Sequence, residues 1–428
     1  MRWSRLVSVI LLVGAPLRAD QPDFKARLSA AIARAVEKNP TIGEMEARIA
    51  AARHRVGQST ALPDPEVEVG LQDVPTAHLS LRRDDFTMEK ISARQRFPGV
   101  GKRGAQRRFA EAEVASLESM HADHVVVLAA EVAAELFTLA EIDARAGILE
   151  SSRERLRRAA SSAVERYRVG KGAQADVLLA NLETTATEER LVALRGERRM
   201  VAARFNALQG LPPPETVDPV AFSDVEPSAP AAAELLRDAE SRSAAIAAAA
   251  ADVRRAEEQV RLAHLERRPD WMAATYYAHR IDFEDLAGAS IAVNLPFFQP
   301  KRLRERESEK EAELSGARAS LEAAKNEVRR GASEAYADLE RSLEQARLYR
   351  ASILPQAETN LAAAQEAYTV GQVDFLTYIR AALDRDMYEG ELVMRRAAAW
   401  RALAALQKAS GLPLIEGTPA PGEIHVEK

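Results

Sequence analysis

The stretch YRVGKGAQADVLLANLETTATEERLVALRGERRMVAARFNALQGLP, residues 167–212, recurs in diverged form as YTVGQVDFLTYIRAALDRDMYEGELVMRRAAAWRALAALQKASGLP, residues 368–413. Both copies begin with Tyr-x-Val-Gly and end with Gly-Leu-Pro, and a constant offset of 201 residues relates them without a gap. Chance rarely preserves such spacing over 46 positions. We therefore interpret the chain as a duplicated unit.

The duplication divides the 428 residues into segments. The first unit covers residues 20–212 and the second covers residues 231–413, followed by a tail over 414–428. Residues 213–230 form a linker, because their prolines prevent a helix from continuing. Residues 1–19 have two arginines, an apolar run and a small-residue end, which is the pattern of a signal peptide.

Each unit has the same predicted order of elements. A helix comes first, two strands follow, and a long helix with apolar residues every three or four positions leads into a tight turn and a returning helix. The ranges are 24–58, 66–72, 86–97, 104–167 and 176–209 in the first unit, and 231–266, 271–278, 286–295, a long helix ending at 368, and 374–409 in the second. Pro355 is expected to kink the second long helix.

The strands have the length and pattern of membrane strands. The first strand alternates apolar Val67, Val69 and Leu71 with polar Glu66, Glu68 and Gln72. Each strand is near the roughly 9–11 residues that a tilted membrane strand needs. Because polarity alternates along such a strand, we predict that the three apolar side chains face lipid. Four strands cannot close a barrel with a real interior, so copies of the chain must associate. Three copies would supply twelve strands, and the count alone leaves two or four copies open.

Composition excludes several classes of function. The net charge of -5 and the pI near 6.0 give no basic domain for nucleic acid. The absence of cysteine excludes disulfides, thiolate metal sites and a lipid anchor on an N-terminal cysteine. We find no catalytic triad spacing, phosphate-binding loop or HExxH motif, so we expect neither an enzyme nor a cofactor.

The duplicated order of helix, hairpin and helix carries a family resemblance. Together with Gly-Lys-Arg after the first hairpin, and Tyr-x-Val-Gly followed by Asp176-Val177-Leu178, it resembles the TolC-like outer membrane factors of tripartite efflux pumps. The resemblance implies an α+β membrane protein in the outer membrane of a Gram-negative bacterium. It implies a homotrimer whose twelve-stranded β-barrel continues into an α-helical periplasmic barrel, with a periplasmic adaptor and an inner-membrane pump as partners. The short hairpins and Gly-Lys-Arg are most similar to the heavy-metal branch.

The resemblance also points to a gate at the periplasmic tip. It implies a constriction at Tyr167 and Tyr368 and pore-facing acids near Asp176. Gly170 and Gly371, which end the long helices, are themselves suited to left-handed C-terminal caps. An acidic ring would favour cations. The alternative is that the tyrosines only pack helix ends and that the aspartate is an ordinary solvated side chain. The second unit departs from the first, since Thr377 matches Asp176 and the nearest acid is Asp374.

The predicted function is a passive outer-membrane conduit for metal cations or small toxic compounds. The alternative is a periplasmic coiled-coil scaffold without channel activity.

Two further motifs have competing interpretations. His121 and His124 have the spacing to share a metal, although exposed histidines are the simpler reading. The pairs Lys102-Arg103 and Lys301-Arg302 could contact lipid phosphate or form plain solvated clusters.

Overall fold

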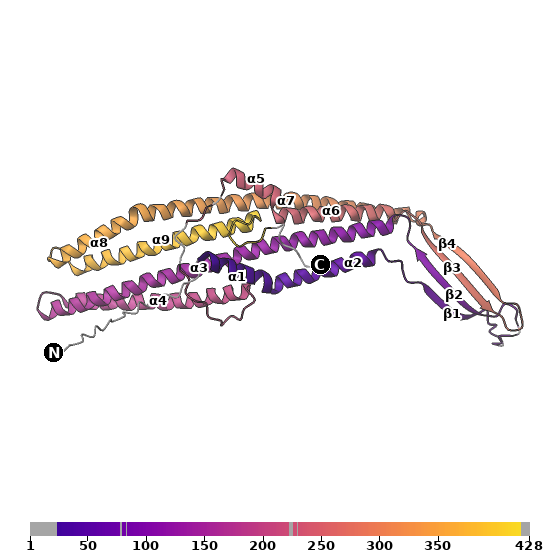
Figure 1. The fold of residues 1–428 in the computed structure, drawn as a ribbon, viewed down its shortest axis with the longest axis horizontal. Coiled ribbons are helices and arrows are strands. Elements are labelled where there is room, and N and C mark those ends of the chain that lie inside the picture. Colours follow the sequence, from indigo (N-terminus) through magenta and orange to yellow (C-terminus); the bar gives the residue numbers. More distant parts are fainter. Residues whose placement is uncertain (1–23, 78, 83, 222–225, 229, 421–428) are drawn as a thin grey trace, which may run out of the picture.

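The computed structural model describes residues 24–77, 79–82, 84–221, 226–228 and 230–420. The expected signal peptide, part of the linker and the end of the tail lie outside these residues. Figure 1 shows an elongated molecule, with a four-stranded sheet at one end and two helix turns at the other. Long helices connect these ends.

The predicted order of elements is confirmed in both repeats. The first repeat contains α1 (Phe24–Lys38), α2 (Pro40–Ser59), β1 (Glu66–Gln72), β2 (Met88–Phe97), α3 (Lys102–Arg168) and α4 (Gln174–Leu208). The second contains α5 (Ala232–Arg242), α6 (Ala244–Leu265), β3 (Asp270–His279), β4 (Leu286–Asn294), η1 (Pro296–Phe298), α7 (Pro300–Leu348), the π-helical turn η2 (Tyr349–Ile353), α8 (Leu354–Thr369) and α9 (Phe375–Ser410). The 67 residues of α3 span about 100 Å.

The first helix of each repeat is broken, so the single helices predicted over residues 24–58 and 231–266 are wrong in this respect. Asn39 separates α1 from α2, with its side chain accepting a hydrogen bond from the Thr41 N–H at 2.9 Å. Pro40 then begins α2, where its missing N–H costs nothing. Ser243, with extended backbone, separates α5 from α6 in the same way.

These breaks explain the Gly-Leu-Pro that closes each repeat. Gly210 and Gly411 end the returning helices with φ angles of 67° and 68°. A Cβ on Gly210 would lie 2.5 Å from the Lys38 carbonyl oxygen, and one on Gly411 would lie 2.8 Å from the Ser243 hydroxyl oxygen. Each returning helix therefore ends against the break in its own repeat, at a distance that only glycine allows.

A buried amide secures the segment after each returning helix. Asn206 donates to the Glu215 carbonyl oxygen at 2.8 Å. Gln407, its counterpart 201 residues later, accepts from the N–H groups of Leu414 and Ile415 at 3.0 and 2.8 Å. Both side chains are buried, so their bonds replace lost solvation. The linker and the tail thus begin with the same kind of anchor.

The interruption expected near Pro355 takes the form of the π-helical turn η2, which comes directly before α8. Proline cannot donate the N–H that a regular helix requires, and a π turn accommodates that loss. In Figure 1, α8 slopes away from the line of α7. The first repeat has no such turn, since α3 is continuous.

Small and aliphatic residues hold the helices together. The largest cluster of buried residues joins α3 to α1, α4, α7 and α9, and Phe137 at its centre stacks between Phe24 and Trp400. Many of the buried residues are alanines, which allow close helix approach. Within the part of the chain that the structure describes, no helix combines the length and apolar content needed to cross a membrane.

The four strands form one antiparallel sheet in the order β1-β2-β3-β4. The two hairpins therefore meet through β2 and β3, where Phe97 pairs with Trp271 and Glu89 with His279. Strands β1 and β4 are the edges.

Candidate functional site: the sheet and the helical tip

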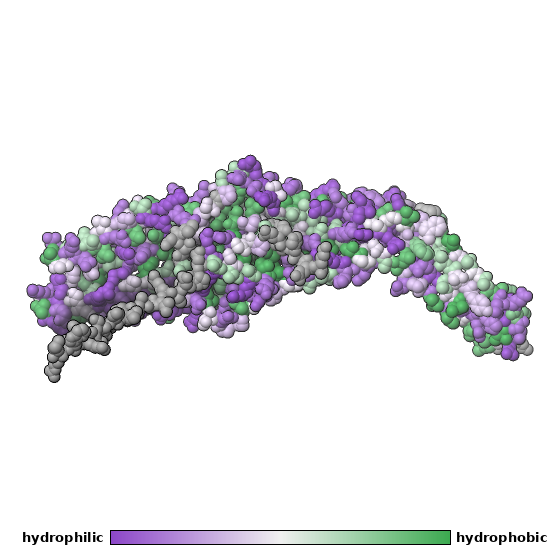
Figure 2. All heavy atoms as spheres, in the orientation of Figure 1, coloured by the Kyte–Doolittle hydropathy of each residue, from purple (hydrophilic) through white to green (hydrophobic). Residues whose placement is uncertain are grey.

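One face of the sheet is apolar. Directly opposed residues of antiparallel strands lie on the same face. Val69, Ile91, Tyr277 and Ala287 oppose one another across the four strands. Val69 is 75% exposed, and Ile291, farther along the same face, is 74% exposed. In Figure 2, hydrophobic residues reach the surface over the sheet, whereas hydrophilic residues predominate over α7.

The predicted alternation of β1 is therefore present. Val67, Val69 and Leu71 share the apolar face with Ala93 and Ile91. The polar residues on this face are Gln95 and Thr275 within the sheet, and Glu89 and His279, which pair beside the hairpin loops. Exposed aliphatic groups of this extent need an apolar partner.

Over β1 and β2 the other face is polar and internally paired, whereas over β3 and β4 it carries mainly small residues. Arg94 pairs with Glu68, and Arg96 pairs with Glu66 at 3.0 Å. Lys90 donates to Gln72 at 3.1 Å, and its ammonium lies 4.9 Å from the centre of the Tyr276 ring. Predicted polar residues Glu66, Glu68 and Gln72 thus meet polar partners from β2. A sheet with one apolar and one polar face separates two environments.

The Gly-Lys-Arg motif joins the sheet to the helices. Lys102, with a side chain only 13% exposed, bonds to the Asp270 carboxylate at 2.7 Å. Arg103 donates through Nε to the Thr60 carbonyl oxygen at 2.9 Å, just after α2. Both cations bind inside the chain, and their contact with lipid phosphate stays a prediction. The motif is an internal connection.

The two tip turns at the far end of the molecule are alike. Gly170 and Gly371 have φ angles of 71° and 81°. In the first turn the N–H of Gly170 bonds to the Tyr167 carbonyl at 3.0 Å, and that of Lys171 bonds to the Arg166 carbonyl at 2.8 Å. The second turn repeats both bonds. This is the Schellman pattern, for which left-handed glycine is favoured.

The two tip tyrosines differ. Tyr368 stacks on Tyr378, with ring centres 5.5 Å apart and an interplanar angle of 7°, and also contacts Phe375. The guanidinium of Arg166, from the first repeat, lies 4.6 Å from the centre of the Tyr368 ring. Tyr167 is 50% exposed. The structure therefore gives Tyr368, and not Tyr167, a place between the two helical hairpins.

Electrostatics place Asp176 near this cluster. Burial raises the pKa of the Tyr368 hydroxyl, the Asp176 carboxylate raises it further, and Arg166 opposes the change. The Asp176 carboxylate also accepts the Ala173 N–H at 3.3 Å. Asp176 thus caps α4 while it contributes negative charge beside Tyr368.

The capping pattern is divided between the repeats. In a full capping box, residues at the N-cap and three positions later bond to each other's N–H groups. Asp374 is the N-cap of α9 and accepts from the Thr377 N–H at 2.8 Å, which lowers the Asp374 pKa. Asp176 supplies the reverse bond in the first repeat. Thr377 stands where the first repeat has Asp176, because the acid that caps the returning helix is Asp374, at the N-cap, in the second repeat.

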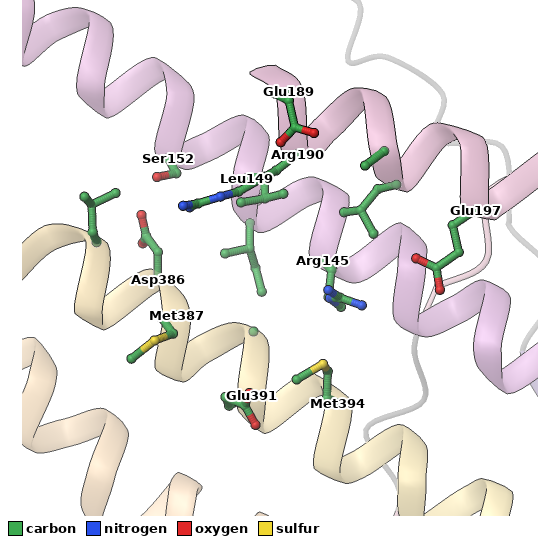
Figure 3. A pocket seen from close by; sticks show the side chains of 15 residues that line it. Arg145, Leu149, Ser152, Glu189, Arg190, Glu197, Asp386, Met387, Glu391 and Met394 are labelled. Atoms are coloured by element: carbon green, nitrogen blue, oxygen red, sulfur yellow. The ribbon is translucent and has the colours of Figure 1, made fainter. Parts of the chain in front are cut away.

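A groove separates the two hairpins above the tip (Figure 3). Its volume is about 380 Å³, and α3, α4 and α9 line it. Arg145 and Arg190 lie on the first-repeat side, and Asp386 and Met387 lie on α9. Arg155 and Arg385 both pair with Asp386. Relative movement of the hairpins must change the shape of this groove.

The two histidines differ, and the expectation that both are exposed is wrong for His121. His121 is 3% exposed, and its Nε2 lies 3.8 Å from Glu46, whereas His124 is exposed. Burial lowers the pKa of His121. Among the described residues, no group of three or more His, Cys, Asp or Glu side chains could hold a metal ion.

Sequence comparison now identifies the fold. The profile of the outer membrane efflux protein family matches residues 31–211 and 235–412, which are the two repeats. The chain belongs to the outer membrane efflux protein family. A comparison with curated proteins found no significant match. As a member of this family, the protein is an outer-membrane efflux channel, and its long helices are the periplasmic extension.

Solved structures share the fold. The outer-membrane channel OprN is 20% identical, with a TM-score of 0.74 and 90% of each chain covered. The outer membrane protein VceC from Vibrio cholerae is 18% identical, with a TM-score of 0.75 and coverage of 90% of this chain and 96% of that one. CusC is 15% identical, with a TM-score of 0.74 and coverage of 90% and 92%. These similar scores do not separate one branch of the efflux family from another.

Sequence reasoning missed the partners of Tyr368. Phe375 and Tyr378 align with Gln174 and Val177 of the first repeat, and Arg166 aligns with Ala367. The available signal was that Phe375 and Tyr378 are aromatic in the second repeat only. Their role depends on Arg166, which lies 202 residues before Tyr368 in the sequence and could not be placed beside it without the structure.

Proposed function

We propose that three copies of this protein form the outer-membrane channel of a tripartite efflux system. The observation that carries the proposal is the sheet, which has one apolar face, one polar face and two edge strands in a single chain. Hydrocarbon does not tolerate unpaired strand edges. Pairing of β4 with β1 of the next copy would remove both edges, and three copies would close twelve strands.

The proposal orients the sheet. The face with Val67, Val69 and Leu71 contacts lipid, and the face with the Arg94–Glu68 and Arg96–Glu66 pairs lines the lumen. Exposed aliphatic groups gain a hydrocarbon environment, while the charged groups remain with water and with each other.

We also propose that the tip is the gate. The contact of Arg166 with Tyr368 joins the first hairpin to the second within one chain. Separating the hairpins removes this cation–π contact, so the contact favours the closed tip. Asp176 adds negative charge at the same place. Tyr167, which has a half-exposed ring, is available to a neighbouring copy.

A periplasmic adaptor and an inner-membrane pump complete the proposed system. Val169 and Val370 are exposed apolar residues at the two tip turns. They provide contact area for an adaptor where the channel must open. The proposed cargo is metal cations or small toxic compounds, and the energy comes from the pump.

Three measurements test this function. Native mass spectrometry of the detergent-solubilised protein should give three chains, and planar bilayers should show discrete conductance steps. Deletion of the gene should raise sensitivity to metal cations or to small toxic compounds. A stable monomer without detergent and without conductance would instead support the periplasmic scaffold.

A further inference from the structure

A cavity of about 420 Å³ lies where the sheet meets the helices. Residues of α3, α6 and α7 line it together with Pro98, Asp270 and Asn294. Asp270 opposes Asn294 and lies two residues along β3 from Met272, which opposes Arg96 and Ala292. Because faces alternate along a strand, Asp270 and Asn294 continue the polar face that carries Arg96. The cavity therefore opens on the polar side of the sheet.

The lining of this cavity is cationic. It contains four basic residues, Lys102, Arg268, Arg302 and Arg306, and two acidic residues, Glu266 and Asp270. Lys102 bonds to Asp270 at 2.7 Å, and Arg306 bonds to Glu266 at 2.9 Å. Both acids are thereby neutralised. Arg268 and Arg302 have no carboxylate partner in the part of the chain that the structure describes.

The local backbone positions Arg268. Its Nη1 donates to the Val100 carbonyl oxygen at 2.6 Å. The next residue, Gly101, has a φ of 90°, and a Cβ there would lie 2.9 Å from that same Nη1. Gly101 therefore leaves room for the guanidinium as well as adopting a left-handed conformation. One nitrogen of Arg268 is anchored, and the fork keeps further N–H donors for a ligand.

We propose that this cavity binds a phosphate-class oxyanion in the channel lumen, through Arg268 and Arg302. Guanidinium groups pair with phosphate in a bidentate manner, and basic rings line pores that conduct anions or phosphate. Three copies would place three such sites around the lumen. The luminal position rests on the proposed function, because it follows from directing the apolar face to lipid.

The same register argues against a lipid headgroup as the ligand. Phe97, Trp271 and Val293 oppose one another on the apolar face at this end of the sheet. Aromatic residues mark the membrane interface in such proteins. The cavity lies at the same level on the opposite face, where soluble anions and not lipid phosphates have access.

Pyrophosphate binding to the purified trimer in nanodiscs tests the site. Isothermal titration at low salt should show one site per chain, weakened at least about tenfold in the double variant Arg268→Gln/Arg302→Gln. The matched control is Lys301→Gln/Arg304→Gln, which removes the same charge from exposed positions of α7 outside the cavity. The control should stay within about twofold of the unmodified protein. Higher salt should weaken binding, since the interaction is between charges.

The outcomes separate the two proposals. Equal binding by the Arg268/Arg302 variant and the control would overturn the site, even if the protein conducts in planar bilayers. If the unmodified protein binds pyrophosphate but shows no conductance, the proposed channel function would instead be overturned. Nanodiscs of phosphatidylcholine and of phosphatidylglycerol should give the same pyrophosphate affinity. Competition by phosphatidylglycerol alone would show that the ligand is a lipid headgroup and that the luminal assignment is wrong.

Discussion

The two repeats are alike where each returning helix ends, whereas at the tip, where it begins, the turns match but the tyrosines do not. At the ends, Gly210 and Gly411 have nearly equal φ angles and both press against the helix break of their own repeat. At the tips, Tyr368 is enclosed by Arg166 and Tyr378, while Tyr167 is half exposed. The difference shows that repeats stay alike where their neighbours are alike.

The tip has two kinds of neighbour. Within one chain, Tyr368 faces the first repeat and meets Arg166. In the proposed trimer, Tyr167 would face the second repeat of another copy, where Ala367 stands at the position equivalent to Arg166. The same cation–π contact cannot form there. A trimer would therefore alternate two unlike junctions around its tip, and the intrachain junction would be the stronger one.

The largest expected effect comes from a charge on the apolar face of the sheet. Val69→Arg in β1 and Ala273→Arg in β3 should each cost about 2–4 kcal/mol if they lie near the bilayer midplane. Glu68→Arg and Ala274→Arg, on the polar face, should assemble far better. The yield of folded trimer in the outer membrane measures the effect. A defect in β1 without one in β3 would show that the two hairpins do not enter the same bilayer.

The next effect compares the two ends of the returning helix. Gly210→Ala should cost about 2–3 kcal/mol, because a left-handed alanine costs roughly 1–2 kcal/mol and its Cβ meets the Lys38 carbonyl. Gly170→Ala should cost only about 1 kcal/mol, since a Cβ there meets nothing within 4 Å. Urea unfolding followed by circular dichroism measures both. Equal losses of unfolding free energy in the two variants would contradict the close contact assigned to Gly210.

The third effect compares the tyrosines directly. Tyr368→Ala should weaken the tip by about 1–2 kcal/mol, through loss of the stacked ring and the cation–π contact. Tyr167→Ala should change it by less than about 0.5 kcal/mol, as for other exposed positions. Single-channel conductance in planar bilayers should rise clearly in the first variant and little in the second. Arg166→Gln should reproduce most of the Tyr368→Ala phenotype, and failure to do so would contradict the proposed closed-state contact.

A chemical cross-link sharpens the same comparison, because the protein has no cysteine of its own. Cysteines at Arg166 and Tyr368, joined by a short cleavable linker, should hold the tip closed and reduce conductance. Cleavage of the linker should restore the conductance of the uncross-linked variant. Unchanged conductance after complete cross-linking would place the gate elsewhere.

The smallest effect concerns the divided caps. Asp176→Asn should leave trimer stability nearly unchanged and reduce the preference of the channel for cations. Asp374→Asn should weaken α9 slightly at neutral pH. The folded pKa of Asp374 is lowered by its bonds with Thr377, so this stabilisation is present above the unfolded pKa and is lost as pH falls through the folded one. Stability against pH should therefore differ between variant and parent only at neutral pH, with no difference in strong acid.

The order of elements could be read from the sequence, since it depends on local rules. Alternation in Glu66–Gln72 predicts a two-faced strand, and the left-handed Gly170 and Gly371 follow from the Tyr-x-Val-Gly repeats. The helix breaks at Asn39 and Ser243 were not predicted from the sequence, because a single residue between two runs of strong helix formers gives little signal. The role of these breaks is visible only in the folded structure, where Gly210 and Gly411 end the returning helices against them.

By itself the sequence determined the duplication, the period of each segment and the residues of each turn, because these depend on neighbours a few positions apart. Only the tertiary structure decided that Lys102 binds Asp270, that Arg103 binds Thr60 and that Tyr368 meets Arg166. These contacts join segments between about forty and two hundred residues apart, and packing selects them from many alternatives of similar local energy. Equivalent residues in the two repeats thus acquired different roles once folding gave them different neighbours.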